Sequence, residues 1–156
     1  MTKKIDPLDK KILQILQNDG EVSLDEIAQR VSSSRTPVWN RIRKMKDSGV
    51  IRKIAAELDP EKLGLGSCFF VLVRTSAHAS EWVNRFTQAI DDLPEIVEAH
   101  RLAGEIDYIL KVYVPDTRAF DAFYQRLVNR VEIFNVTSTL SMEVMKPHSG
   151  FTLDQL

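Results

Sequence analysis

The feature that most constrains this chain is a basic segment, residues 32–46, which opens with three serines. Val38, Ile42 and Met45 recur in it at the helical period and predict a helix with one narrow apolar stripe. The opposite side is polar and basic: Thr36, Asn40, Arg43 and Lys44. Side chains of these types hydrogen-bond to base edges and phosphates. The same pattern is also typical of a solvated, charged helix face, so this segment alone leaves both interpretations open.

Two further helices are predicted upstream of the basic segment. Asp6-Pro7 is typical of a helix start, with proline at the first helical position, and the helix buries Leu8, Ile12, Ile15 and Leu16. Ser23 and Glu26 have the spacing of a capping box. A short helix follows, with an apolar inner side: Leu24, Ile27, Ala28 and Val31. Two short helices joined by a tight turn, the second of them basic, are typical of a helix-turn-helix unit. Residues 50–58 are predicted to be extended, as a candidate wing.

Charge is divided unevenly along the 156 residues, whose net charge is −1. Residues 1–58 hold 12 basic and 8 acidic residues, a net charge of +4, whereas residues 59–156 hold 9 and 14, a net charge of −5. A basic segment suits a polyanion such as double-stranded DNA, and the acidic remainder suits a different task. Chance variation in charge between two domains is the alternative explanation.

The sequence favours a protein of the cytoplasm. Its one cysteine, Cys68, lies in an apolar segment, where a core role is expected, and a disulfide within the chain is excluded. No apolar run is long enough to span a bilayer, and the N-terminus lacks the apolar core of a signal peptide. We therefore expect a cytoplasmic, nucleoid-associated protein with no membrane partner.

The hydrophobic period changes after a linker at residues 59–66. The elements predicted beyond it are a strand at 68–73, a helix at 80–92, strands at 96–102 and 107–114, a helix after Asp116, and a strand at 136–145. This βαββαβ order predicts a ferredoxin-like sandwich with both helices on one face of a four-stranded sheet. The other face needs a cover, for which we expect a second copy of the chain. The predicted fold class is thus α+β, a winged helix-turn-helix domain followed by a ferredoxin-like domain.

The turn at residues 104–108 has two interpretations. Glu105 and Asp107 could hold an ammonium while backbone N–H groups near Gly104 hold a carboxylate, an arrangement that suits a free amino acid. Alternatively, the segment is a hairpin turn in which Gly104 supplies a positive φ and Asp107 bonds to its own backbone.

The sequence gives little support for catalysis. Its histidines, His78, His100 and His148, are scattered without the spacing of metal ligands. It has neither a phosphate-binding glycine loop nor a serine in a nucleophile-elbow context. We predict that the chain is not an enzyme and needs no cofactor and no metal.

Taken together, the segments of this chain resemble the Lrp/AsnC (leucine-responsive / asparagine-operon regulator) family of bacterial transcription factors over residues 5–146. The segments that carry the resemblance are 5–13, 27–31, 47–51, 58–64, 103–108 and 142–146. In residues 58–66, 80–82 and 123–129, the sequence resembles the branch that contains the cysteine-detoxification regulator more than the leucine-responsive protein itself.

The resemblance implies a DNA-binding transcriptional regulator of amino-acid metabolism that dimerises through its C-terminal sheet and assembles further, often to octamers. It also implies an amino-acid effector, bound at the glycine–aspartate turn and the last strand: Gly104, Glu105, Asp107, Tyr108, Thr137, Ser138 and Thr139. Residues 36–39 of the basic helix differ from the sequence that is common in the family, so the resemblance does not predict which operator sequence is bound. An architectural DNA-binding protein of the same fold, with no effector, is the alternative.

The predicted organisation is a DNA-binding domain with its wing at 1–58, a linker at 59–66, a ligand-sensing and dimerisation domain at 67–146, and a tail at 147–156. The predicted DNA contacts are Ser33, Ser34, Arg35, Thr36, Trp39, Asn40, Arg43, Lys44 and Lys46.

Overall fold

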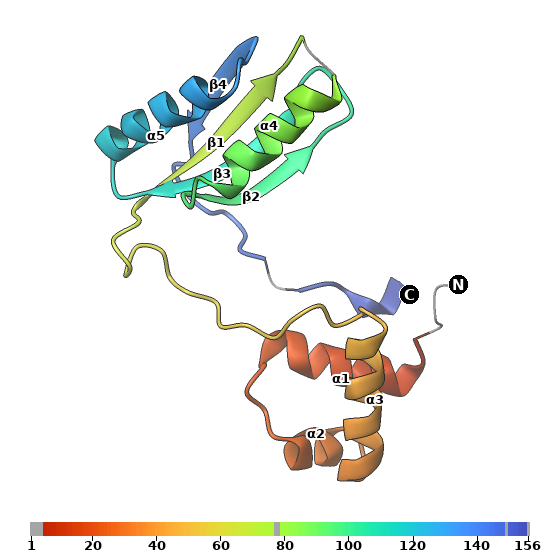
Figure 1. Cartoon of the computed structure of the whole chain (residues 1–156). Coiled ribbons are helices and arrows are strands. Elements are labelled where there is room, and N and C mark those ends of the chain that lie inside the picture. Colours follow the sequence, from red (N-terminus) through yellow and green to blue (C-terminus); the bar gives the residue numbers. More distant parts are fainter. Residues whose placement is uncertain (1–4, 77–78, 149, 156) are drawn as a thin grey trace. The chain divides into compact units, whose positions relative to one another are not determined.

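The computed structural model describes residues 5–76, 79–148 and 150–155. The chain forms two compact units, shown in Figure 1: Met1–Glu57 together with Lys146–Leu156, and Leu58–Met145. The first unit is therefore built from both ends of the sequence. Among the described residues, no helix has the length and apolar character needed to cross a membrane.

Three helices form the first unit: α1 (Pro7–Asn18), α2 (Leu24–Arg30) and α3 (Arg35–Asp47). Asp6 caps α1 in a reciprocal capping box with Asp9, which confirms the predicted helix start. The cap of α2 differs from the prediction. Ser23 Oγ accepts the Glu26 N–H at 3.2 Å, but the Glu26 carboxylate pairs with Arg30 one turn later instead.

One apolar core holds the three helices together. Its buried members are Ile12, Ile27, Ala28, Val31, Val38, Ile42 and Met45. The predicted stripe of α3 is buried as expected, and Val38 is fully inaccessible to solvent. Fully burying one such aliphatic side chain stabilises the fold by about 1.5–3 kcal/mol. The stripe therefore fixes which face of α3 is left for solvent.

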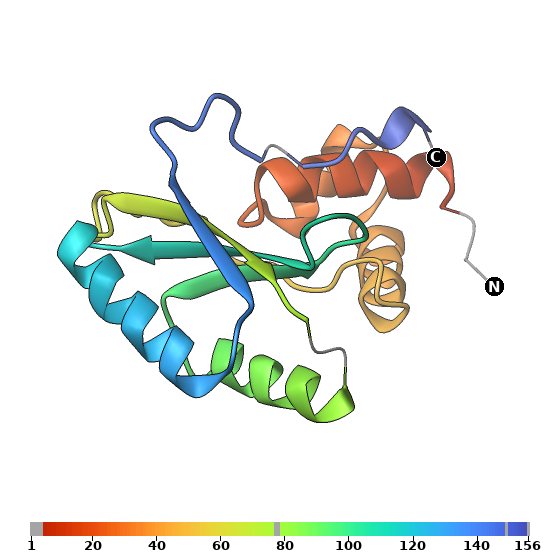
Figure 2. The same ribbon diagram turned by 90° about the horizontal axis from the view of Figure 1, so that it is seen from above.

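The second unit is the predicted α/β sandwich. Its elements are β1 (Ser67–Arg74), α4 (Ser80–Asp91), β2 (Ile96–Arg101), β3 (Tyr108–Val114), α5 (Thr117–Arg130) and β4 (Asn135–Leu140). The strands form one sheet in the order β2-β3-β1-β4, and every neighbouring pair is antiparallel. Figures 1 and 2 show α4 and α5 together on one face of this sheet.

Alternation along the strands separates the two faces of the sheet. Beneath the helices lie the buried side chains of β1 and β3: Phe69, Val71, Val73, Tyr108, Leu110, Val112 and Val114. The helix-free face carries half-buried side chains between them: Cys68, Phe70, Leu72, Ile109, Lys111 and Tyr113. Cys68 is thus half-buried on the helix-free face rather than in the core, because it alternates with the buried Phe69.

Two predicted extended segments are shorter in the structure. Residues 50–58, the candidate wing, form no strand within the described chain, because nothing there pairs with them. The last strand ends at Leu140 rather than at residue 145. Beyond it, the Ser141 N–H still donates to the Cys68 carbonyl at 2.8 Å, but Met142 and Met145 are almost fully exposed.

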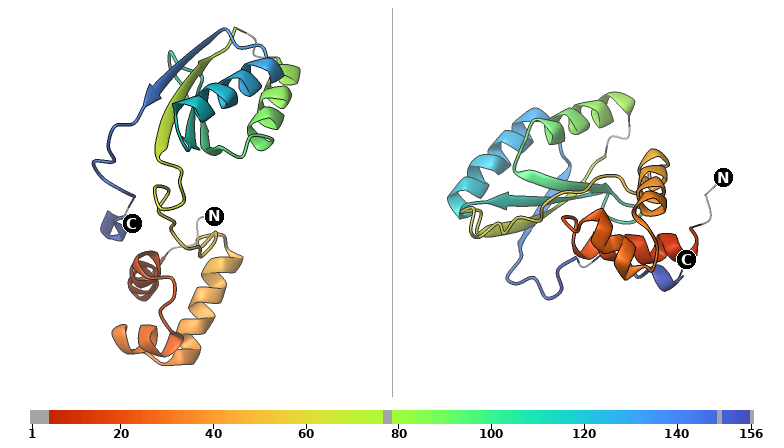
Figure 3. Two further views of the ribbon diagram at one scale, coloured as in Figure 1. Left: turned by 90° about the vertical axis from the view of Figure 1, so that its left-hand side faces the viewer. Right: turned by 90° about the horizontal axis from the view of Figure 1, so that it is seen from below.

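The C-terminal segment of the first unit docks on α1. The Gln17 side-chain amide bonds both backbone groups of Phe151, donating to its carbonyl at 2.8 Å and accepting from its N–H at 3.0 Å. Gly150 enables the approach, since its φ is +84° and an added Cβ would lie 2.7 Å from the Gln17 side chain. A short 3₁₀ turn, η1 (Leu153–Gln155), follows. Figure 3 shows the segment from two sides.

Candidate nucleic-acid interface and effector turn

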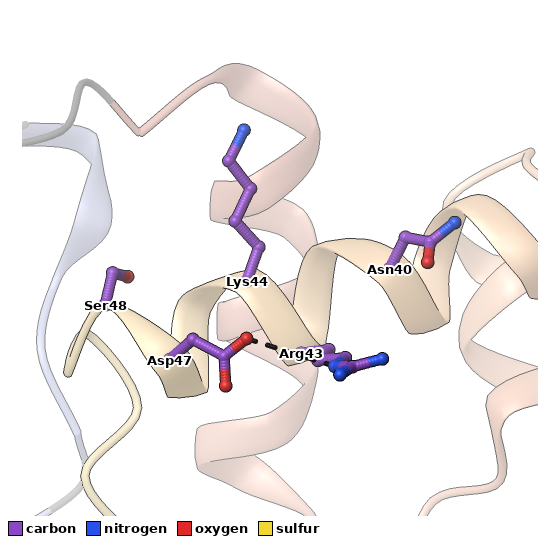
Figure 4. A pocket seen from close by; sticks show the side chains of 5 residues that line it. All are labelled: Asn40, Arg43, Lys44, Asp47 and Ser48. Carbon is purple, nitrogen blue, oxygen red and sulfur yellow. Dashed lines mark ion pairs between the residues drawn. The ribbon is translucent and has the colours of Figure 1, made fainter.

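The outward face of α3 presents most of the predicted DNA-contacting side chains to solvent. The exposed members are Ser34, Arg35, Thr36, Trp39, Asn40, Arg43, Lys44 and Lys46, whereas Ser33 is half-buried. Asn40, Arg43 and Lys44 line an open depression of about 360 Å³ with Asp47 and Ser48 (Figure 4). The helix therefore offers amide, guanidinium and ammonium donors along one continuous side.

The entry into α3 leaves a hydroxyl and backbone donors available. Ser32 has a positive φ of 51°, which turns the chain between α2 and α3, and the Ser33 N–H donates to the Ala28 carbonyl at 2.8 Å. Ser34 is the N-cap residue but makes no side-chain capping bond. A helix N-terminus carries partial positive charge and attracts phosphate oxygens.

Arg43 is held loosely on the outward face. Its guanidinium carbon lies 5.3 Å from the centroid of the Trp39 ring, and its Nε lies 3.9 Å from a carboxylate oxygen of Asp47. All three side chains are exposed, so water weakens these attractions. Arg43 is therefore preoriented over Trp39 but remains able to exchange Asp47 for another acceptor.

Arg41 is a functional candidate that the sequence reasoning missed. Its Nη1 donates to Asp6 at 2.5 Å and to Asp9 at 2.8 Å, at the start of α1. The hydrogen bond from Arg41 is the main reason that the pKa of Asp6 lies below its ordinary value of 3.8. The two carboxylates in turn raise the pKa of Arg41, with Asp6 the larger cause.

In the second unit, the predicted effector turn joins β2 to β3 and is tied to β1. The Asp107 carboxylate accepts the Thr75 N–H at 2.8 Å, and the Asp107 N–H donates to the Val73 carbonyl at 3.0 Å. The Asp107 side chain thus bonds backbone at the end of a neighbouring strand and not its own backbone, while the Asp107 carbonyl closes the turn by accepting the Leu102 N–H at 2.7 Å. Gly104 is exposed and is not among the glycines with positive φ, so the hairpin interpretation fails in that detail.

Glu105 provides the exposed carboxylate of this turn. Its Oε1 lies 3.7 Å from Nη1 of Arg74 at the end of β1, and the Glu105 side chain is 83% exposed. The Arg74 guanidinium also lies 5.9 Å from the centroid of the Phe134 ring. Sequence spacing gave no sign of Arg74, because it reaches the turn across the sheet.

Two of the predicted effector residues lie on the helix side of the sheet. Tyr108 is 8% exposed, and its ring packs against Phe86 and Trp82 in the core beneath the helices. Register separates the last-strand residues: Thr137 and Thr139 pair with Leu72 and Phe70 on the helix-free face, whereas Ser138 pairs with Val71 of the opposite face. Tyr108 and Ser138 therefore lie on the face opposite to Thr137 and Thr139.

The remaining ionisable side chains give no metal centre among the described residues, where no three His, Cys, Asp or Glu groups lie together. His100 bonds Glu98 at 2.7 Å on β2, and His148 lies near the Phe151 ring. His78 lies outside the described residues.

Two family profiles match the chain. The winged helix-turn-helix DNA-binding profile matches residues 5–52, and the Lrp/AsnC ligand binding domain profile matches residues 68–151. Over 143 residues the chain is 43% identical to the DNA-binding transcriptional activator DecR of Escherichia coli K12, covering 91% of this chain and 94% of DecR.

Solved structures match the fold over nearly the whole chain. The crystal structure of an AsnC family transcriptional regulator from Agrobacterium tumefaciens is 44% identical, with a TM-score of 0.92, and the match covers 97% of this chain and 99% of that one. Regulator NMB0573 of Neisseria meningitidis, solved with L-Met, is 29% identical, with a TM-score of 0.92 and the same coverage. The family resemblance and the fold class predicted from the sequence are confirmed: the chain belongs to the Lrp/AsnC family of DNA-binding transcriptional regulators.

Proposed function

We propose that this regulator reads its operator with the outward face of α3 and changes its DNA binding or assembly when a small amino acid occupies the turn at residues 104–107. The observation that carries the proposal is the division of α3. Val38, Ile42 and Met45 are buried, so the donors of Asn40 and Arg43 are left facing solvent on the opposite side. Its targets are genes of amino-acid metabolism, and its place of action is chromosomal DNA in the cytoplasm.

Each side chain on this face has a proposed task. Asn40 and Arg43 contact base edges, since an amide pairs with adenine and a guanidinium with guanine. Trp39 lies beside Arg43 and supports its guanidinium. Phosphates are bound by the cations and hydroxyls around them: Ser33, Ser34, Arg35, Thr36, Lys44 and Lys46.

The effector site uses charge at the turn. Glu105 offers an exposed carboxylate to the ligand's ammonium, and Asp107, which organises the turn through Thr75, adds negative charge behind it. Backbone N–H groups near Gly104 bind the ligand's carboxylate. Thr137 and Thr139 complete the site from the helix-free face. The relative solved with L-Met supports an amino acid as the ligand class.

Assembly is proposed through the helix-free face of the sheet. Phe70, Leu72 and Ile109 are apolar, lie on that face and are only half-buried within one chain. A second copy would cover them in a homodimer, and dimers would assemble further, to octamers. The chain has no catalytic task in this proposal and needs no cofactor.

The DNA assignment is tested with two alanine variants. The probes are a duplex that the wild-type chain enriches from a random-sequence pool and a scrambled duplex of equal composition. Arg43→Ala should weaken binding to the enriched duplex by about 1–3 kcal/mol and relax preference at one base position. Lys46→Ala should weaken both duplexes alike and lower the salt slope by about 1. Indistinguishable behaviour of the two variants on both duplexes would contradict the assignment.

The effector assignment is tested by thermal denaturation with each common amino acid, with and without the enriched duplex. A ligand that binds only the folded chain raises stability by RT ln(1 + [L]/Kd). If no amino acid shifts the melting temperature while DNA binding is intact, the chain is an architectural DNA-binding protein without an effector.

A further inference from the structure

Arg41 of α3 directs its guanidinium toward α1, at the margin of the buried stripe. The helix has five basic residues, all in the described part of the chain, and four are exposed: Arg35, Arg43, Lys44 and Lys46. The Arg41 side chain is 32% exposed, next to the buried stripe, and its guanidinium is bonded to α1. Its charge is therefore satisfied inside the unit.

The two acceptors of Arg41 are also the two members of the α1 capping box. Asp6 uses Oδ1 to cap the N–H groups of Leu8 and Asp9, both at 2.9 Å, and Oδ2 to accept Arg41. Asp9 uses Oδ2 to accept the Asp6 N–H at 3.3 Å, and Oδ1 to accept Arg41. Each carboxylate thus gives one oxygen to its own helix and the other to α3.

This division links the position of α3 to the start of α1. The apolar contacts of Val38, Ile42 and Met45 determine the buried side of α3, but they are non-directional and define its exact rotation and height less sharply than a hydrogen bond does. Charge-assisted hydrogen bonds are shorter and directional, and Arg41 makes two from one nitrogen. One residue of an α-helix corresponds to a rotation of about 100° and a rise of about 1.5 Å, so even a fraction of that shift would move Asn40 and Arg43 relative to their bases.

We propose that Arg41 is a positioning residue for DNA recognition: clasped by Asp6 and Asp9, it sets the rotation and height of α3 and does not contact DNA. This inference rests on the proposed role of α3 as the reading helix. It makes specific DNA binding depend on two acidic residues, which would by charge alone repel DNA.

We call the hydrogen bonds from Arg41 to Asp6 and Asp9 the clasp. A substitution at Asp6 distinguishes positioning of α3 by this clasp from a simple effect of net charge on DNA affinity. Asp6→Asn keeps an oxygen that can cap α1, because asparagine is a good N-cap residue, but it replaces the acceptor of Arg41 with a donor. Losing one negative charge should tighten DNA binding if only charge matters. If the clasp positions α3, the same change should weaken binding to the enriched duplex.

The experiment measures full-length wild-type, Arg41→Gln and Asp6→Asn on the enriched and scrambled duplexes over a series of KCl concentrations. Glu21→Gln is the matched control, because it removes one exposed negative charge from the same unit. Circular dichroism melting sets an assay temperature at which every variant is folded. We expect both clasp variants to lose about tenfold or more in affinity for the enriched duplex, with little change on the scrambled duplex and an unchanged salt slope. The control should bind as tightly as wild type or more tightly.

Two results would overturn the inference. In one, Arg41→Gln weakens both duplexes equally and lowers the salt slope by about 0.9, as loss of a phosphate contact does. In the other, Asp6→Asn binds the enriched duplex as tightly as the Glu21→Gln control does. The double variant, Arg41→Gln with Asp6→Asn, provides a further check. If both substitutions act by breaking the same hydrogen bonds, it should lose no more affinity for the enriched duplex than either single variant does.

Arg41→Lys answers the same question if Arg41→Gln melts too low to assay. Lysine keeps the charge, but its shorter side chain stops short of the Nη1 position between the two carboxylates. A phosphate contact predicts near-wild-type binding with an unchanged slope, whereas the clasp predicts loss of preference for the enriched duplex. Arg43→Ala distinguishes failure of the proposed reading face from failure of the proposed role of Arg41. If Arg43→Ala does not change the preference for the enriched duplex, the reading face of α3 itself is misassigned.

Discussion

At the residue scale, Asp107 organises its turn and has a proposed second task in effector binding, and one substitution separates the two. In Asp107→Asn, a side-chain oxygen remains to accept the Thr75 N–H, so the turn should keep its shape while losing its charge. A charged hydrogen bond contributes about 1.5–3 kcal/mol, so affinity for an amino acid identified by the thermal screen should fall about 10- to 150-fold. Melting temperature and operator affinity without ligand should stay near wild type. A parallel fall of both, with no ligand found for the wild type, would assign Asp107 a structural role only.

The lowered pKa of Asp6 predicts how the stability of the DNA-binding unit changes in acid. Its pKa is lowered in the folded chain, chiefly by the hydrogen bond from Arg41, so the unfolded chain binds this proton more readily. The stabilisation is present above the unfolded value of 3.8 and is lost as the pH falls through the lower folded pKa. Melting curves from about pH 2 to 5 should therefore show a loss of stability in acid that is smaller in Arg41→Gln. Equal acid sensitivity in the two proteins would contradict this cause.

Residue roles were only partly predictable from the sequence. The exposure of Asn40 and Arg43 follows from helical period, because Val38, Ile42 and Met45 determine the buried side. Arg41 lies at the margin of that stripe, and its acceptors are more than thirty positions away, so no local pattern reveals the clasp. The effector role predicted for Tyr108 comes from its neighbouring motif, whereas strand alternation places its side chain with the buried Leu110.

At the scale of helices and strands, the sequence predicts an element best where the residues that form it lie close together in the chain. The helix starts at Asp6, Ser23 and Asp116 are each formed by a side-chain cap on nearby N–H groups. Extended segments depend on partners elsewhere, which period alone does not supply. Residues 50–58 have strand-like composition but no pairing strand in the described chain, so the predicted wing is not formed there.

The docking of the C-terminal segment on α1 is tested at Gly150. Alanine there would meet Gln17 at 2.7 Å and would have to adopt a φ of +84°, both unfavourable. We expect Gly150→Ala to detach the segment, seen as faster hydrogen exchange of the Phe151 amide. Gly104→Ala is the control, because its Cβ would meet no described atom within 4 Å. Unchanged protection at Phe151 in Gly150→Ala would show that the Gln17 bonds do not hold the segment.

For the whole molecule, the helix-free sheet face predicts the state of assembly. Leu72 lies on that face, between Ile109 of β3 and Thr137 of β4. Leu72→Glu places a charge where a second copy would bury it, which is costly without a partner. Sedimentation at micromolar protein should show wild-type oligomers and a smaller species for Leu72→Glu. Thr87→Glu, on the exposed side of α4, should sediment as wild type. A compact wild-type monomer would reject the proposed interface.

The return of the C-terminal segment to α1 has a consequence for how the protein is made. A ribosome delivers residues 1–57 first, and the three helices can then pack around Ile12 and Val38. Gln17 receives its backbone partner only after residues 58–145, the whole second unit, have been synthesised and Phe151 has emerged. The first unit is therefore begun before the second and completed after it, and a nascent chain that stalls within the second unit carries an incomplete first one.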